Sequence, residues 1–186
     1  LREKLVKKHL SEFGFPAIES LDSIVKNYWN YPAREMQYSI QGILSKLKKN
    51  FQKEHIHTLE YMIVNGSWWD TVDYIAGDLV GSYFQKFPGE IDKWTDQWMN
   101  SDNFWLQRTC ILYQLKYKEK TDFDRLKSYI LPCAGSDEFF LQKAIGWSLR
   151  QYSKTNPEAV LEFIQNHQLR ALSVREGMKW IQKSSV

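Results

Sequence analysis

Apolar residues recur at spacings of three and four along the whole chain. Such spacing indicates amphipathic helices, whereas the alternating apolar and polar runs that indicate strands are short everywhere. In segment 69–87 the i, i+3, i+4, i+7, i+8, i+11 pattern of one buried helix face is formed by Val72, Ile75, Ala76, Leu79, Val80 and Tyr83. The sequence therefore predicts an all-α fold.

Proline and glycine divide the chain into segments of roughly 10 to 18 residues, the lengths found in arrays of helical hairpins. The breaks fall at Phe15-Pro16, Tyr31-Pro32, Asn65-Gly66, Phe87-Pro88-Gly89, Ala134-Gly135 and Asn156-Pro157. None of them is a linker between domains, so we expect a single domain over residues 1–186. Because the chain starts at Leu1 and LREKLVKK already has a helical pattern, we expect that an N-terminal helical segment is missing.

Two octapeptides, SDNFWLQR at 101–108 and SDEFFLQK at 136–143, lie 35 residues apart and are identical at five of eight positions. Their Ser and Asp precede an apolar run, where side-chain oxygens are expected to cap a helix start. The same offset aligns Tyr38, Asp73, Arg108 and Lys143. Periods of this length are typical of solenoids whose inner helices line a concave face. We therefore expect a HEAT-like helical-repeat solenoid of stacked antiparallel helix pairs; a helix-start pattern that arose twice by chance is the alternative.

The composition excludes several classes of protein. Cys110 and Cys133 are not arranged as a CxxC pair, and His55 and His57 cannot share a helix face, so we expect neither a disulfide framework nor a metal site. Phosphate-binding, dinucleotide and nucleophile-elbow motifs are missing, and we expect no cofactor. Apolar runs are far shorter than the roughly 18 residues of a membrane span. A cytoplasmic protein fits these features.

The formal net charge of +3 is only mildly basic, so nucleic-acid binding depends on where the cations cluster. In segment 137–154 a basic stripe with a tryptophan inside it follows i, i+4, i+7, i+11 and consists of Lys143, Trp147, Arg150 and Lys154. Such a stripe suits a phosphate backbone, with the indole packed against sugar or base; a solvated cationic face is the alternative. Arg108 lies in the same row and is able to hold a phosphate with two hydrogen bonds, or to pair with Asp102 or Asp137.

Trp69 and Asp73 are four residues apart and should share one helix face at the repeat position that faces the concavity. An indole and a carboxylate would then lie on one surface. The alternative is that Trp69 packs in the core and Asp73 is a first-turn acid stabilised by the helix dipole.

The words SWWDTVD (67–73), SDNFWLQR (101–108) and LQKAIGWSLRQYSKTNP (141–157) closely resemble the bacterial AlkD-type DNA alkylation-repair glycosylases. NYPAREMQY (30–38) and LSVRE (172–176) extend the resemblance over nearly the whole chain. Family members usually carry further N-terminal helices that contact DNA, and those are not in this sequence.

The resemblance implies a monofunctional, monomeric base-excision repair enzyme that hydrolyses the glycosidic bond of 3-methyladenine, 7-methylguanine and related cationic purines in duplex DNA, without flipping the base. By matching position, the catalytic residues are Asp73, Trp69 and Trp147, and the DNA contacts are Arg108, Arg150 and Lys154, beside Lys143 of the basic stripe. A cationic purine leaves without a general acid, and a carboxylate and aromatic faces stabilise the oxocarbenium character of the sugar. The alternative is a non-catalytic helical-repeat scaffold that binds nucleic acid or protein.

Overall fold

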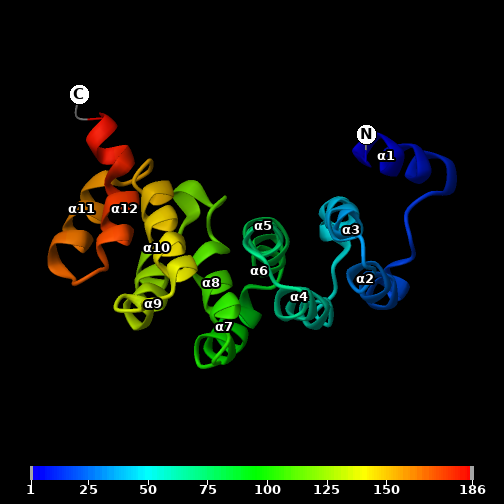
Figure 1. Cartoon of the computed structure of the whole chain (residues 1–186), viewed down its shortest axis with the longest axis horizontal. Coiled ribbons are helices and arrows are strands. Elements are labelled where there is room, and N and C mark those ends of the chain that lie inside the picture. The colour runs from blue at the N-terminus through cyan, green and yellow to red at the C-terminus, as the bar shows by residue number, and fades with distance from the viewer. Residues whose placement is uncertain (1, 185–186) are drawn as a thin grey trace. The chain divides into compact units, whose positions relative to one another are not determined.

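The structure, a computed structural model, describes residues 2–184, which form α-helices joined by 3-10 and π-helical turns and contain no strand (Figure 1). The all-α prediction is confirmed. The chain divides into two compact units, residues 1–91 (unit 1) and 92–186 (unit 2). That the two units form a single domain stays a prediction.

In unit 1, α3 is the central helix of the inner layer and contacts both α1 and α5, while α2 contacts α3 and α4. A π-helical segment, Ile75–Val80, joins α5 to α6 without interrupting the helical path. The bounds are α1 Arg2–Phe13, α2 Leu21–Trp29, α3 Arg34–Leu47, α4 His55–Val64, α5 Trp69–Tyr74 and α6 Gly81–Lys86, with 3-10 turns at Ile18–Ser20, Lys48–Asn50 and Pro88–Glu90.

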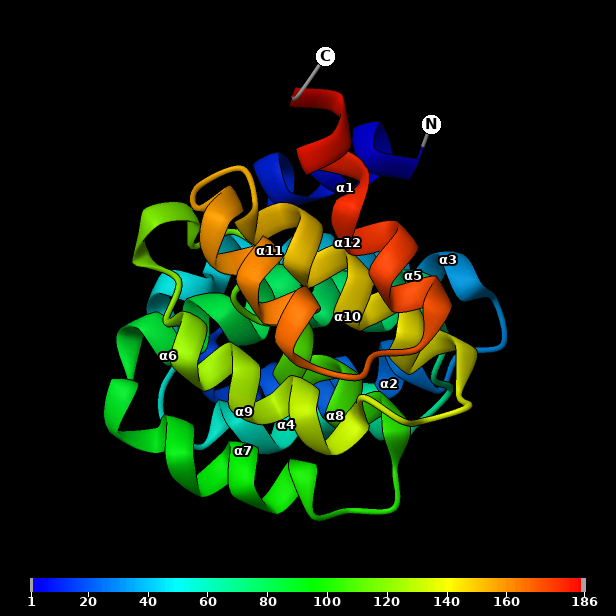
Figure 2. The ribbon, with the colours of Figure 1, turned by 90° about the vertical axis from the view of Figure 1, so that its left-hand side faces the viewer.

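In unit 2, α10 lies between α8 and α12, while α9 packs on α8 and α11 packs on α12 (Figures 1 and 2). The bounds are α7 Ile91–Met99, α8 Phe104–Leu112, α9 Phe123–Cys133, α10 Phe139–Tyr152, α11 Pro157–Asn166 and α12 Ala171–Ser184, with a 3-10 turn at Lys118–Lys120. Figure 2 shows α10 and α12 side by side on one face of this unit.

The 35-residue repeat is visible in the helix boundaries, because α3, α5, α8 and α10 begin at residues 34, 69, 104 and 139. The two octapeptides also fold alike. Gln107 Nε2 donates to the Ser101 carbonyl at 2.9 Å, and Gln142 Nε2 donates to the Ser136 carbonyl at 3.1 Å. The prediction of a helical-repeat fold is therefore confirmed.

The prediction that Ser and Asp of the octapeptides cap these helices is wrong by one or two residues. The caps are Asn103 and Glu138, whose side chains accept from the amides of Trp105 at 2.9 Å and Phe140 at 3.1 Å. The reason is that each helix begins at the fourth residue of its octapeptide, so the third residue takes the capping position.

The predicted apolar stripe is the core of unit 1: all six residues from Val72 to Tyr83 in the stripe are fully buried. What the pattern did not predict is the π-helical segment that carries four of them. A π turn widens the helix locally, but here the apolar side chains stay buried. The spacing of apolar residues therefore does not distinguish this π-helical segment from an α-helix.

Candidate active site

Helix α3 holds the start of α5 through a network around Asp70. Tyr38 Oη donates to Asp70 Oδ2 at 2.7 Å, and Arg34 forms an ion pair with Asp70 Oδ1 while its Nε donates to Tyr38 Oη at 2.9 Å. Burial raises the pKa of Asp70, but the hydrogen bonds from Tyr38 and Arg34 outweigh it and leave the pKa below its ordinary value. The negative charge of Asp70 is thus paired with Arg34 and hydrogen-bonded by Tyr38 within unit 1.

The same face of α3, with the 3-10 turn that follows it, continues this contact along α5 and into the π-helical segment. Gln41 Nε2 donates to the Thr71 carbonyl at 3.0 Å. Further along, Asp78 in the π-helical segment is buried and accepts from Ser45 Oγ at 2.6 Å and from Lys48 Nζ at 2.9 Å. Polar groups of α3 therefore fix the chain on both sides of Asp73.

Trp69 is the first residue of α5, and Asp73 follows four residues later on the same helix. The alternative of a core role for Trp69 is wrong, because its side chain is 47% exposed. The first-turn acid of α5 is Asp70, whereas Asp73 lies in the last turn and is half-buried. An exposed indole and a carboxylate therefore occupy one helix at i, i+4 spacing, as predicted.

Sequence reasoning passed over three neighbours of this pair. Trp68 precedes α5 and is also 47% exposed, and Tyr74 ends the helix with an exposed ring. Asp70 was overlooked because its role depends on Arg34 and Tyr38, which are more than 30 positions away in the chain. The doubled tryptophan was the available signal for Trp68.

In unit 2 the basic stripe of α10 is organised by a carboxylate of α12. Lys143 Nζ and Arg150 Nη1 each lie 3.0 Å from a carboxylate oxygen of Glu176, and Lys179 Nζ lies 2.7 Å from it. The side chain of Glu176 is only 6% exposed. The hydrogen bonds from Lys179 and Lys143 outweigh burial and lower the pKa of Glu176 to about 2. Lys143 and Arg150 therefore belong to an ion cluster with Glu176, and binding of DNA by the stripe stays a prediction.

Gly146 allows α10 and α12 to approach closely enough for this cluster. A Cβ at position 146 would overlap the Cβ of Glu176 and lie 3.0 Å from the Ser173 carbonyl. Ser173 Oγ donates to the Gln142 carbonyl at 3.0 Å, which ties the same two helices together. Any side chain at residue 146 would push Glu176 away from α10.

Of the remaining stripe residues, Trp147 lies on α10 and Lys154 lies in the turn that follows this helix. Trp147 is half-buried, and Lys154 is exposed. Lys154 Nζ lies 5.7 Å from the ring centroid of Trp180, a distance typical of a cation–π contact, and 2.8 Å from Gln151 Oε1. Since Trp180 belongs to α12, the mixed basic and aromatic surface spans both helices.

The environment of Arg108 differs from those of Asp73 and Lys143, which occupy the equivalent position in other repeats. Its side chain is 3% exposed, and its guanidinium donates to the Phe140 carbonyl and lies 5.9 Å from the Phe140 ring centroid. Asp137, one of the partners expected for it, pairs with Arg170 at 2.6 Å. Arg108 thus ties α8 to α10, and its contact with DNA stays a prediction.

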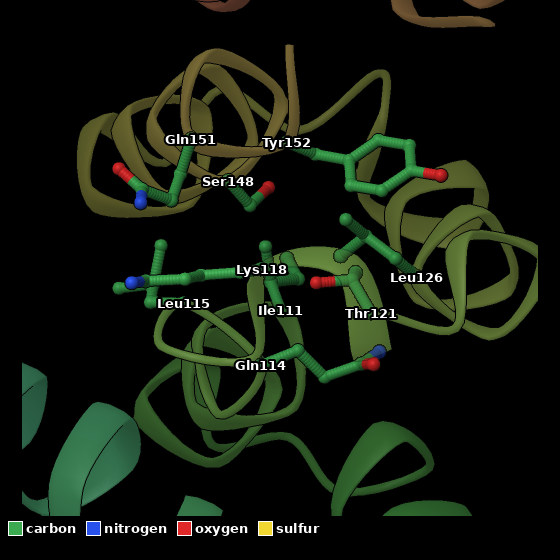
Figure 3. Close-up of a pocket in the computed structure, with 9 residues that line it drawn as sticks. All are labelled: Ile111, Gln114, Leu115, Lys118, Thr121, Leu126, Ser148, Gln151 and Tyr152. Atoms are coloured by element: carbon green, nitrogen blue, oxygen red, sulfur yellow. The ribbon is translucent and has the colours of Figure 1, made fainter. Parts of the chain in front are cut away.

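Each unit contains a cavity of a different size. The cavity of unit 2, between α8, α9 and α10, has a volume of about 10 Å³, enough for one water at most; Figure 3 shows Gln114, Ser148 and Tyr152 around it. In unit 1 an open cavity of about 400 Å³ lies between α1, α3 and α5, and Tyr38, Asp70 and Tyr74 form part of its wall. The unit 2 cavity is too small for a nucleobase.

Among residues 2–184, no three His, Cys, Asp or Glu side chains gather in a way that would hold a metal ion. Across the same residues, no helix combines the length and apolar composition that crossing a bilayer requires.

Comparison with known proteins identifies a family and similar solved structures, two of which are described here. A model of the family described as DNA alkylation repair enzyme matches residues 1–181. A predicted DNA alkylation repair enzyme from Enterococcus faecalis is 36% identical, with a TM-score of 0.88 over 98% of this chain and 85% of that one. The protein smu.31 from Streptococcus mutans UA159 is 14% identical, with a TM-score of 0.72 over 96% of this chain and 92% of that one, and shows the fold alone. Among curated proteins none matches the sequence.

Proposed function

The chain belongs to the family of DNA alkylation repair enzymes, and on that premise we propose that it is a monofunctional DNA glycosylase. Its substrates are N3- and N7-alkylated purines in duplex DNA, such as 3-methyladenine and 7-methylguanine. The reaction is hydrolysis of the bond between the purine nitrogen and C1′ of the deoxyribose.

The observation that carries the proposal is the pair of Trp69 and Asp73 on α5, a helix that α3 anchors on both sides of Asp73. When the glycosidic bond breaks, its electron pair neutralises the cationic purine, which leaves without being protonated. Positive charge then develops on the sugar, where the Asp73 carboxylate stabilises it. A water oxygen bonds to C1′ and passes a proton to Asp73, which also orients that water.

Trp69 and Trp147 complete the proposed catalytic set through their aromatic faces. The negative π surface of an indole favours a neighbouring cation, and the sugar becomes cationic in this reaction. The indole of Trp69 is half exposed and thus accessible to a nucleic acid. We assign Lys143, Arg150 and Lys154 to the DNA backbone, because phosphate contacts supply a large share of the affinity for a duplex. Arg108 joins them only if its guanidinium leaves the Phe140 carbonyl, because the residue is 3% exposed.

We also propose that the lesion stays stacked in the duplex while the bond is cut. Enzymes that flip a base hold it in a closed pocket. The unit 2 cavity accommodates one water at most, and the cavity of about 400 Å³ in unit 1 is open to solvent. Selectivity then comes from the charge of the lesion, which makes its own bond labile. Monomeric state and cytoplasmic location stay predictions.

The decisive measurement is release of 7-methylguanine from methylated duplex DNA by wild type and Asp73→Asn. We expect the substitution to lower the rate at least about 100-fold, as removal of a key transition-state stabiliser does, while the affinity for DNA is unchanged or higher. Asp124→Asn is the matched control, because this carboxylate of α9 is 93% exposed and lies in unit 2. Full activity of Asp73→Asn would refute the role.

Neutral lesions test the second part of the proposal. A duplex that contains uracil should release little base, because uracil lacks the positive charge that labilises the bond. Rapid uracil release would contradict selectivity by lesion charge. A wild-type protein that binds the methylated duplex and releases no base would instead be a scaffold.

A further inference from the structure

The ion cluster of α10 and α12 has more cations than its single carboxylate neutralises. We propose that it is a binding site for a backbone phosphate of DNA, in which Glu176 is a positioning residue and Lys179 is a phosphate contact. The proposal rests on the proposed function only in taking DNA as the ligand.

The cluster has an excess of positive charge on its outer side. Three cations and one carboxylate leave a net charge of +2, with Lys143 and Arg150 on α10 and Lys179 on α12. The carboxylate is 6% exposed, whereas the three cationic side chains are 39%, 33% and 48% exposed. Solvent and any ligand therefore meet the cations first.

Glu176 fixes the directions of the three cations. Each long side chain would otherwise sample many rotamers and lose that freedom when it binds a phosphate. Here the freedom is already lost on folding, because the two oxygens of one carboxylate hold all three nitrogens at 2.7–3.0 Å. The cluster is thus preorganised, and Gly146 keeps its centre close to α10.

A polyanion fits this surface better than a single small anion. The three cationic side chains are 33% to 48% exposed and extend over two neighbouring helices, so they can meet several positions along a chain of phosphates. Lys154 and Trp180 continue the same surface, and a cation beside an indole suits a sugar–phosphate chain. The observations therefore favour a backbone phosphate over inorganic phosphate.

The sign of the effect of Glu176→Gln distinguishes positioning from simple charge. The substitution makes the protein one unit more positive, so simple electrostatics predicts tighter binding to DNA. If Glu176 positions the cations, binding weakens and the salt dependence becomes shallower in spite of the added charge. The affinity is measured by fluorescence anisotropy with a labelled, unmodified duplex over a series of salt concentrations.

Lys179→Ala tests the phosphate contact in a variant that should fold, since its side chain is half exposed. Each phosphate contact contributes about 0.9 to the slope of log K against log salt, so loss of one lowers the affinity about eightfold at 0.1 M salt. Lys127→Ala on α9 and Glu162→Gln on α11 are the matched charge controls. The lysine control should leave the slope nearly unchanged, and the glutamate control should not weaken binding.

The outcomes separate this inference from the proposed function. Binding by Glu176→Gln as tight as that of wild type, or an unchanged slope in Lys179→Ala, would overturn the inference alone. Displacement of DNA by inorganic phosphate beyond that by chloride at equal ionic strength would assign the cluster to free phosphate and overturn the backbone assignment. A wild-type protein that does not bind the duplex would refute the proposed function itself.

Discussion

Acid should remove the stabilising effect of Glu176 over a defined pH range. Its pKa is about 2 in the folded protein against 4.5 as the ordinary value. A carboxylate with a depressed pKa contributes stability that is complete above the unfolded pKa and is lost as pH falls towards the folded pKa. The window for Glu176 therefore runs from about pH 4.5 to about pH 2.

The size of this effect follows from the shift. A pKa difference of about 2.5 corresponds to about 3 kcal/mol of unfolding free energy at neutral pH, of which about 2 kcal/mol is lost by pH 3. The side chain is 6% exposed, so solvent screens the interaction little. Since Glu176→Gln cannot titrate, its unfolding free energy lacks this component.

The assay compares the urea-unfolding free energies of wild type and Glu176→Gln at several pH values between 7 and 3. Other carboxyl groups with lowered pKa values, such as Asp22 and Asp70, titrate in both proteins and cancel in the difference. Wild type should be more stable at pH 7, and the difference should shrink by about 2 kcal/mol at pH 3. A difference that does not change with pH would refute the reasoning.

Three further predictions, the first with a control substitution, test the packing and the site. Gly146→Ala should lower the free energy of unfolding, measured by thermal unfolding, by about 1–3 kcal/mol, because the added Cβ would overlap Glu176. Gly42→Ala in α3 is the control and should be stabilising, because nothing lies within 4 Å of a Cβ there. Equal effects of the two substitutions would contradict the close approach of α10 and α12. Tyr38→Phe should lower the free energy of unfolding by about 1 kcal/mol, because it removes the hydroxyl that donates to Asp70. An unchanged melting temperature would contradict that hydrogen bond. Trp69→Ala should slow base release with little change in melting temperature, because its indole is half exposed; full activity would remove it from the site.

Periodicity made much of the fold predictable. The 35-residue offset located four helices whose first residues follow it, and the apolar stripe of segment 69–87 is the core of unit 1. Both features are local or periodic, so short stretches of sequence are enough to predict them. The capping error shows the limit of such reasoning, because it depended on fixing a helix start to within one or two residues.

The partners of the site residues could not be predicted in this way. The sequence indicated Lys143 and Arg150 as cations on one stripe, but their common partner is Glu176 on another helix, 33 and 26 positions away. Asp70 likewise depends on Arg34 and Tyr38 from another helix. Such pairings follow from how closely two helices pack, and here Gly146 permits the approach.

The polar contacts between helices one repeat apart have a consequence for how each unit forms. Pairs such as Arg34–Asp70, Ser45–Asp78, Lys143–Glu176 and Arg170–Asp137 join residues 33 to 36 positions apart, which is about one repeat. No long chain segment has to be closed before these contacts form, and such topologies fold quickly. Folding of either unit can therefore begin at any adjacent pair of helices and extend to the neighbouring helices. A destabilising substitution in one repeat should slow folding of that repeat without preventing folding of the others.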